Sequence, residues 1–129
     1  MSQSIVALNT NILMAVAKQQ FNPAVLAQRH QVILTSVVCR AEALGFGFPA
    51  AAEKGRMELF LRSLEVRPFT LEEARFVVSY RQHPQRKIKL PDAAILATAR
   101  AAGTNLLTEN LADFQGLDPQ VRVLSLTDL

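Results

Sequence analysis

The chain reads Leu90-Pro91-Asp92-Ala93-Ala94-Ile95-Leu96-Ala97-Thr98-Ala99 and continues, after Gly103, with Asn105-Leu106-Leu107-Thr108. The first part is rich in alanine, has a proline at its start and ends at a glycine, which predicts a helix over about residues 91–103. The second part is a short apolar run, which predicts a strand. Because α/β proteins alternate such helices and strands, this stretch indicates an α/β fold.

The same alternation extends over the rest of the chain. Short apolar runs predict strands at residues 4–8, 32–35, 66–68 and 120–124, the last at a sheet edge. Helices, counted with their capping residues, are expected at about residues 9–19, 22–30, 36–45, 50–63 and 70–82. In the last of these, Thr70 and Glu73 form a capping box. We therefore expect a three-layer α/β/α fold with a mostly parallel central sheet, in a single domain over residues 1–129.

Composition limits the class of protein. Half of the 129 residues are hydrophobic and 19% are charged, which permits a sizeable core and argues against disorder. The single Cys39 cannot form an internal disulfide and reads as a small buried side chain, which favours a reducing compartment. No window reaches the roughly 18 apolar residues that a membrane helix needs, and the N-terminus lacks a signal-peptide pattern. We expect a soluble, cytoplasmic protein.

Polar residues gather where predicted strands end and helices begin. Four motifs carry them: Leu8-Asn9-Thr10-Asn11, Ser36 to Glu42, Pro91-Asp92-Ala93-Ala94 and Thr108 to Phe114. A doubly wound sheet brings such edges into one crevice. Glu42, Asp92 and Asp113 would repel one another there unless a divalent cation held them. The eight acids left outside this pocket face fourteen bases, which suits a polyanionic substrate.

Each acidic residue also has a simpler interpretation when taken alone. The first turn of a helix favours Asp92 through its dipole and its unpaired N–H groups. Glu42 would lie on the solvated face of its helix, and Asp113 would cap a turn. The order and spacing of the four motifs together are more specific than any one of them.

Taken together, the motifs resemble the PIN-domain family. The match is strongest for Asp92-Ala-Ala-Ile-Leu-Ala-Thr-Ala followed by Leu106 to Phe114, and the two N-terminal motifs come in the expected order. The chain is most similar to the small VapC-type toxins of bacterial type II toxin–antitoxin pairs. The resemblance implies a PIN-like fold and a metal-dependent endoribonuclease that hydrolyses RNA phosphodiesters. It also implies a cognate antitoxin partner and a homodimer.

The resemblance also implies roles for individual residues. The ligands of Mg²⁺ or Mn²⁺ would be Glu42, Asp92 and Asp113, with Asn9 at the first-motif position. Hard oxygen donors of this kind select those ions over zinc. The ligands would be supported by Thr10, Asn11, Ser36, Thr108 and Asn110. Charge and position in the sequence, and not the resemblance, indicate the residues that would hold RNA phosphates. Arg86, Lys87 and Lys89 belong to the basic stretch 81–89 just before Asp92, whose alternative is a solvated helix end and loop. Arg40, two residues before Glu42, would pair with a phosphate or with a carboxylate.

Asn9 departs from the family pattern, which has an aspartate there. An amide offers a cation an oxygen but no charge, so the metal should bind more weakly. Three explanations stay open: an engineered substitution that disarms the enzyme, a natural protein of low activity or one that binds without cutting, and a site that tolerates the amide. Asn9 is also a good helix cap. The alternative function is thus a catalytically impaired PIN module that binds nucleic acid or an antitoxin.

Two further hypotheses carry less weight. An unrelated α/β phospho-acceptor domain would also have an acidic pocket for Mg²⁺, but it gives no reason for the pattern from Thr108 to Phe114. His30 and His83 lie outside the four motifs and are not expected to act as general bases. The apolar residues near the N-terminus belong either to the core or to a partner-binding surface; they are Ile12, Leu13, Val16 and Phe21.

Overall fold

The computed structural model describes residues 4–129. Residues 1–3, which belong to the expected domain and to the N-terminus analysed for a signal peptide, lie outside the described residues. The elements, in chain order, are β1 (Ile5–Leu8), α1 (Thr10–Ala17), α2 (Ala24–Arg29), β2 (Val32–Ser36), α3 (Val37–Gly45), α4 (Ala51–Arg62), β3 (Glu65–Arg67), α5 (Leu71–Arg81), α6 (Leu90–Ala102), β4 (Asn105–Leu107), α7 (Leu111–Phe114), β5 (Val123–Leu124) and a 3₁₀ turn, η1 (Leu126–Asp128).

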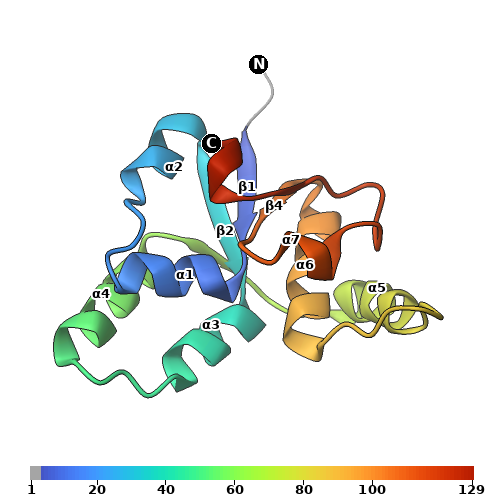
Figure 1. The fold of residues 1–129 in the computed structure, drawn as a ribbon, viewed down its shortest axis with the longest axis horizontal. Coiled ribbons are helices and arrows are strands. Elements are labelled where there is room, and N and C mark those ends of the chain that lie inside the picture. Colours follow the sequence, from blue (N-terminus) through green and yellow to red (C-terminus); the bar gives the residue numbers. More distant parts are fainter. Residues whose placement is uncertain (1–3) are drawn as a thin grey trace.

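The five strands form one sheet in the order β3-β2-β1-β4-β5, and every pair is parallel. Figure 1 shows α1, α2 and α4 on one side of the strands, and α5 and α6 on the other. The expected three-layer α/β/α fold with a parallel sheet is confirmed. The chain first extends the sheet from β1 to β3 and then crosses back to β4, so the strand order reverses between β1 and β4.

Local signals in the sequence explain where most helices begin and end. Asn9 caps α1 by accepting the Thr10 N–H, and Ser36 caps α3 by accepting the Cys39 N–H at 3.0 Å. Gly103 ends α6 with φ +66°, a left-handed conformation that glycine adopts without a steric penalty. The expected capping box of Thr70 and Glu73 is present.

The differences from the expected elements are small, apart from one helix. β5 covers only two residues of the predicted 120–124, and the turn expected around Asp113 is the four-residue helix α7. A single helical turn is too short to show a 3.6-residue period, so the sequence pattern did not reveal it.

The core lies between the sheet and the two helix layers. Side chains from β1, α1, α2, β2, α3, α4, α6, β4 and α7 are fully buried there, and the largest of them are Leu8, Ile12, Leu13, Leu26, Leu34, Met57, Ile95, Leu96, Leu106, Leu107 and Phe114. α6 is buried without interruption over its middle, from Ala93 to Ala99. Because α6 is held so firmly, the residues at its N-terminus have a well-defined position. In the part of the chain that the structure describes, every helix is too short or too polar to cross a membrane.

Candidate active site

The site lies at the carboxyl ends of β1 and β4, where the strand order reverses. The two strands pair in register at Leu8 and Leu107, and the Asn9 N–H continues the ladder by donating to the Leu107 carbonyl at 3.0 Å. The residues that follow, Asn9 and Thr108, are therefore neighbours although 99 positions separate them. Such a reversal point is where open α/β sheets bind ligands.

The Thr108 hydroxyl joins the loops that follow the two strands. Its Oγ1 accepts from Nδ2 of Asn9 at 3.0 Å, from Nδ2 of Asn11 at 3.1 Å and from the Asn110 N–H at 3.1 Å. Oδ1 of Asn9 accepts the Thr10 N–H at 2.8 Å, which turns the amide nitrogen toward Thr108. A hydroxyl oxygen has two lone pairs, so it cannot accept three N–H hydrogen bonds with good geometry at once.

A cavity of about 420 Å³ opens beside this network, and we call it the acidic cavity. It brings together two predicted carboxylates and most of the predicted supporting residues. The residues that line it are Asn9, Thr10, Asn11, Met14, Lys18, Glu42, Phe46, Lys89, Asp92 and Asn110. They come from α1, α3, the start of α6 and the loop after β4, which meet at one end of the strands (Figure 1).

Asp92 is the half-buried carboxylate of this cavity. It lies in the first turn of α6, beside a proline, as expected. Burial is the main reason that its pKa is raised, and the charges of Asp113 and then Glu42 raise it further, while Lys89 and the Asn9 side chain act in the opposite direction. The three carboxylates singled out in the sequence therefore act on one another electrostatically. A cation near Asp92 would relieve this repulsion.

Glu42 and Ser36 have different places on α3. Ser36 is buried and its hydroxyl caps the helix, so its support for the site is indirect. Glu42 lies six residues after Ser36 on α3. It is exposed and lines the acidic cavity. The apolar helix thus presents its single carboxylate to the cavity and not only to solvent.

The donor atoms fit a hydrated divalent ion better than a closed cage. Among residues 4–129, no three His, Cys, Asp or Glu side chains are close enough to hold one ion together. Asp113 does not line the acidic cavity, and its part in a ligand set stays a prediction. Mg²⁺ keeps several waters and binds through one or two carboxylates, which Asp92 and Glu42 supply. Oγ1 of Thr10, buried beside them, has no hydrogen-bond partner within the described residues.

The four predicted RNA-binding residues separate in space. Lys89 lines the acidic cavity and Lys87 is exposed nearby in the same loop. Arg40 instead lines another cavity, of about 390 Å³, with Glu58 and Arg62. The guanidinium of Arg86 donates to the backbone carbonyls of Ala112 and Gln115, so these bonds compete with any bond from Arg86 to an RNA phosphate.

Sequence reasoning missed three residues of the acidic cavity. Met14 on α1 and Lys18 at its C-cap follow Asn11 at the spacing i+3 and i+7, which places them on the same side of the helix. This spacing could have revealed them. Phe46 follows α3, and Nζ of Lys18 lies 5.2 Å from the centre of its ring. The ammonium groups of Lys18 and Lys89 make the rim of the cavity basic.

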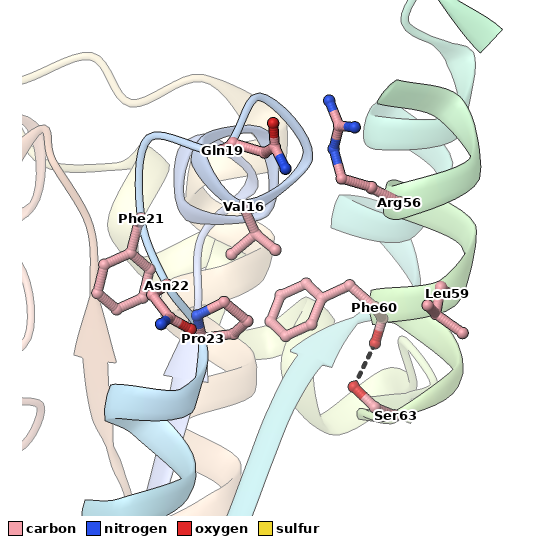
Figure 2. A pocket seen from close by; sticks show the side chains of 9 residues that line it. All are labelled: Val16, Gln19, Phe21, Asn22, Pro23, Arg56, Leu59, Phe60 and Ser63. Carbon is pink, nitrogen blue, oxygen red and sulfur yellow. Dashed lines mark hydrogen bonds between the residues drawn. The ribbon is translucent and has the colours of Figure 1, made fainter. Parts of the chain in front are cut away.

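A second cavity, the apolar cavity, lies between α1, α4 and the segment that joins α1 to α2. Its volume is about 490 Å³, and its lining residues are Val16, Gln19, Phe21, Asn22, Pro23, Arg56, Leu59, Phe60 and Ser63. Figure 2 shows the Phe60 ring pointing toward Val16 and Pro23. Nε of Arg56 donates to the Ala17 carbonyl at 2.7 Å and fastens α4 to the end of α1. Ile12 and Leu13, by contrast, are core residues.

The fold and strand order agree with a PIN domain. The PIN domain family matches residues 6–118, and the chain belongs to that family. No curated protein sequence matches the chain.

Solved structures of similar fold come from toxin–antitoxin systems. VapBC2 from Rickettsia felis, bound to a DNA fragment from its promoter, matches with a TM-score of 0.78 and 20% identity over 94% of this chain and 98% of that one. A toxin–antitoxin complex from Klebsiella pneumoniae matches with a TM-score of 0.72 and 27% identity over 92% and 95%. Mycobacterium tuberculosis VapC20, a toxin that cleaves the sarcin-ricin loop, matches with a TM-score of 0.60 and 16% identity over 78% and 86%.

Proposed function

We propose that this chain is a VapC-type toxin, a metal-dependent endoribonuclease that hydrolyses RNA phosphodiesters. The observation that carries the proposal is the half-buried Asp92, which shares the acidic cavity with Glu42 and the Asn9–Thr108 pair at the strand-order reversal of a PIN fold. The similar structures include a toxin that cleaves the sarcin-ricin loop, which supports a nuclease function.

In this proposal, some residues of the acidic cavity would bind the metal ion and others would bind the RNA. Asp92 and Glu42 would hold Mg²⁺ or Mn²⁺. The bound ion would supply an activated water and neutralise charge that develops on the phosphodiester. Lys18 and Lys89, at the rim of the cavity, would attract and orient the phosphates on either side of the cut. Asn11, which donates to Thr108 and accepts the Glu109 N–H at 3.3 Å, would keep the loops after β1 and β4 in place.

The proposal predicts that Asn9 lowers the nuclease activity of this chain. An aspartate at this position would add a third negative charge to the acidic cavity and would accept a hydrogen bond from the Thr108 hydroxyl, whose oxygen now accepts from three N–H donors. Losing a charged ligand costs metal affinity, and each tenfold loss corresponds to about 1.4 kcal/mol. The same observation favours the second candidate function, a PIN module that binds nucleic acid or an antitoxin without cutting.

RNA cleavage with Mn²⁺ separates the two functions. The unsubstituted chain, Asn9→Asp, and Asn9→Asp combined with Asp92→Asn would be compared on structured and single-stranded RNA. A nuclease predicts that Asn9→Asp cuts at least tenfold faster and that adding Asp92→Asn abolishes cutting. If Asn9→Asp stays inactive on every RNA while RNA still binds, the binding function is the better account.

The apolar cavity is the place proposed for a segment of the cognate antitoxin. Leu59 is 66% exposed at its edge, although it is a large apolar side chain on an otherwise polar helix face. The similar structures from Rickettsia felis and Klebsiella pneumoniae are complexes with antitoxins, which supports such a partner. Leu59→Glu should weaken capture of the co-expressed antitoxin and leave folding unchanged. Val78→Glu changes another exposed apolar side chain, 55% exposed on α5 and outside the apolar cavity, and is the control that should still bind the antitoxin.

A further inference from the structure

The short helix α7 carries Asp113 but has little stability of its own. It contains four residues, far fewer than a helix needs to persist alone in water, and no side chain caps its N-terminus. Its buried anchor is Phe114, the residue after Asp113. The direction in which Asp113 faces must therefore be set by groups outside the helix.

Arg86 is the first of these groups. Its Nη2 donates to the Ala112 carbonyl and its Nη1 donates to the Gln115 carbonyl, at the end of α7 where carbonyls lack partners within the helix. A guanidinium is a rigid planar fork, so two such bonds fix orientation as well as distance. Its positive charge also suits the C-terminal end of a helix. Arg86 belongs to the loop between α5 and α6, which leads directly to Asp92.

Asp118 is the second group, and it fastens the chain just after α7. Its buried carboxylate accepts from the Tyr80 hydroxyl at 2.5 Å, from Nη1 of Arg100 at 2.8 Å and from the Gln120 N–H at 3.0 Å. Tyr80 lies on α5 and Arg100 on α6, and the Arg100 guanidinium also lies 4.9 Å from the centre of the Phe76 ring. The segment 111–118 is thus tied at both ends to the α5–α6 pair.

We propose that Arg86 and Asp118 are positioning residues that hold Asp113 toward Asp92. The positions of both carboxylates are then set by the α5–α6 pair, because α6 carries Asp92 and the pair holds α7. Arg86 consequently acts through the protein backbone and not by binding RNA phosphates. The role of Asp113 in metal binding rests on the proposed function; the fastening of α7 does not.

Hydrogen exchange tests the fastening without any metal or RNA. In Arg86→Ala, the amides of Asp113, Gln115 and Leu117, which donate within this segment, should exchange faster, while amides in the sheet keep their protection. Arg122→Ala removes the same charge from an exposed arginine after α7 and is the matched control. Unchanged exchange of the α7 amides in Arg86→Ala would overturn the proposal.

Mn²⁺ binding, measured by calorimetry with the metal alone, tests the link to Asp113. Supporting residues of this kind change metal affinity by roughly 10-fold to 100-fold. Arg86→Ala should weaken Mn²⁺ binding in the parent and have no further effect when Asp113→Asn is already present. An equal effect of Arg86→Ala in both backgrounds would show that it acts by another route. If Asp92→Asn leaves Mn²⁺ binding unchanged, the proposed function fails, and the exchange comparison still decides whether Arg86 holds α7.

Kinetics in the Asn9→Asp background separate positioning from RNA contact. Positioning predicts that Arg86→Ala lowers kcat with little change in KM, because the RNA-binding rim at Lys18 and Lys89 is intact. Arg86→Lys, which keeps the charge but loses the planar fork, should recover only part of kcat. A rise in KM at constant kcat, fully rescued by Arg86→Lys, would assign Arg86 to RNA binding instead.

Discussion

Nδ2 of Asn9 donates to Oγ1 of Thr108 at 3.0 Å, and both side chains are buried. This bond crosses from the loop after β1 to the loop after β4, at the point where the strand order reverses. It holds together the two loops that line one side of the acidic cavity. The geometry of the site therefore depends on a contact between the first and last motifs of the chain.

Thr108→Val should destabilise the fold by about 1–3 kcal/mol, because it leaves the buried side-chain N–H of Asn9 and the donors of Asn11 and Asn110 without this acceptor. Urea unfolding measures the change. Thr98→Val is a matched control, since the buried Thr98 hydroxyl only donates to the Ala94 carbonyl within α6. A similar loss in both variants would mean that the Thr108 network contributes nothing specific.

Asp92→Asn should stabilise the metal-free protein at neutral pH. The pKa of Asp92 is raised above 3.8, first by burial and then by Asp113 and Glu42. Because the folded state binds this proton more tightly than the unfolded state, the contribution to stability is present below pH 3.8 and is lost as pH rises through the folded pKa. Thermal midpoints of both proteins across pH 3 to 8 test this, since the gain from Asp92→Asn should vanish in acid. A constant difference at every pH would contradict it.

Tyr80→Phe should cost about 1–3 kcal/mol, because the buried Asp118 carboxylate loses a donor. Burial, followed by the Asp118 hydrogen bond and charge, raises the pKa of Tyr80 above its ordinary 10.0. The unfolded state therefore loses the phenol proton first, and stability falls as pH rises above 10.0. Urea unfolding at pH 7 and above pH 10 should show a smaller alkaline loss in Tyr80→Phe. Equal losses in the two proteins would count against this account.

An exposed apolar stripe on α5 predicts self-association. Leu71 and Val78 are 66% and 55% exposed and lie seven residues apart, on one face of the helix. A homodimer that buries this face would be dissociated by Leu71→Glu or Val78→Glu, as measured by sedimentation equilibrium. Leu59→Glu, on α4, should leave the dimer intact. If the unsubstituted protein is a monomer by sedimentation equilibrium, the prediction is wrong.

The order of helices and strands, and most of their ends, could be predicted because the signals are local. Asn9 and Ser36 cap helices with side chains that reach only the next few N–H groups, and Gly103 supplies the one conformation that ends α6. The Thr70–Glu73 box acts over three residues. Such contacts form between near neighbours in the chain, so they leave a pattern that can be read from sequence.

Arg86 and Arg40 show where that reading stops. Both were expected at an RNA surface on the basis of charge and proximity in sequence to Asp92 and Glu42. In the fold, Arg86 reaches carbonyls 26 and 29 residues away, and Arg40 lines a separate cavity with Glu58 and Arg62. The partners of a long side chain depend on which groups the folded structure brings within its reach. The charge of the side chain alone does not reveal those partners.

The sequence by itself determined the α/β class, the helix caps and the four polar motifs, since each depends on hydrogen bonds and burial within a short stretch. Only the tertiary structure decided that Asn9 and Thr108 would touch, that Lys18 would join the acidic cavity, and that α7 would be tied to α5 and α6. These results follow from the parallel pairing of β1 with β4, which brings together residues about a hundred positions apart. Sheet pairing is a long-range choice made by the whole core, and no local pattern encodes it.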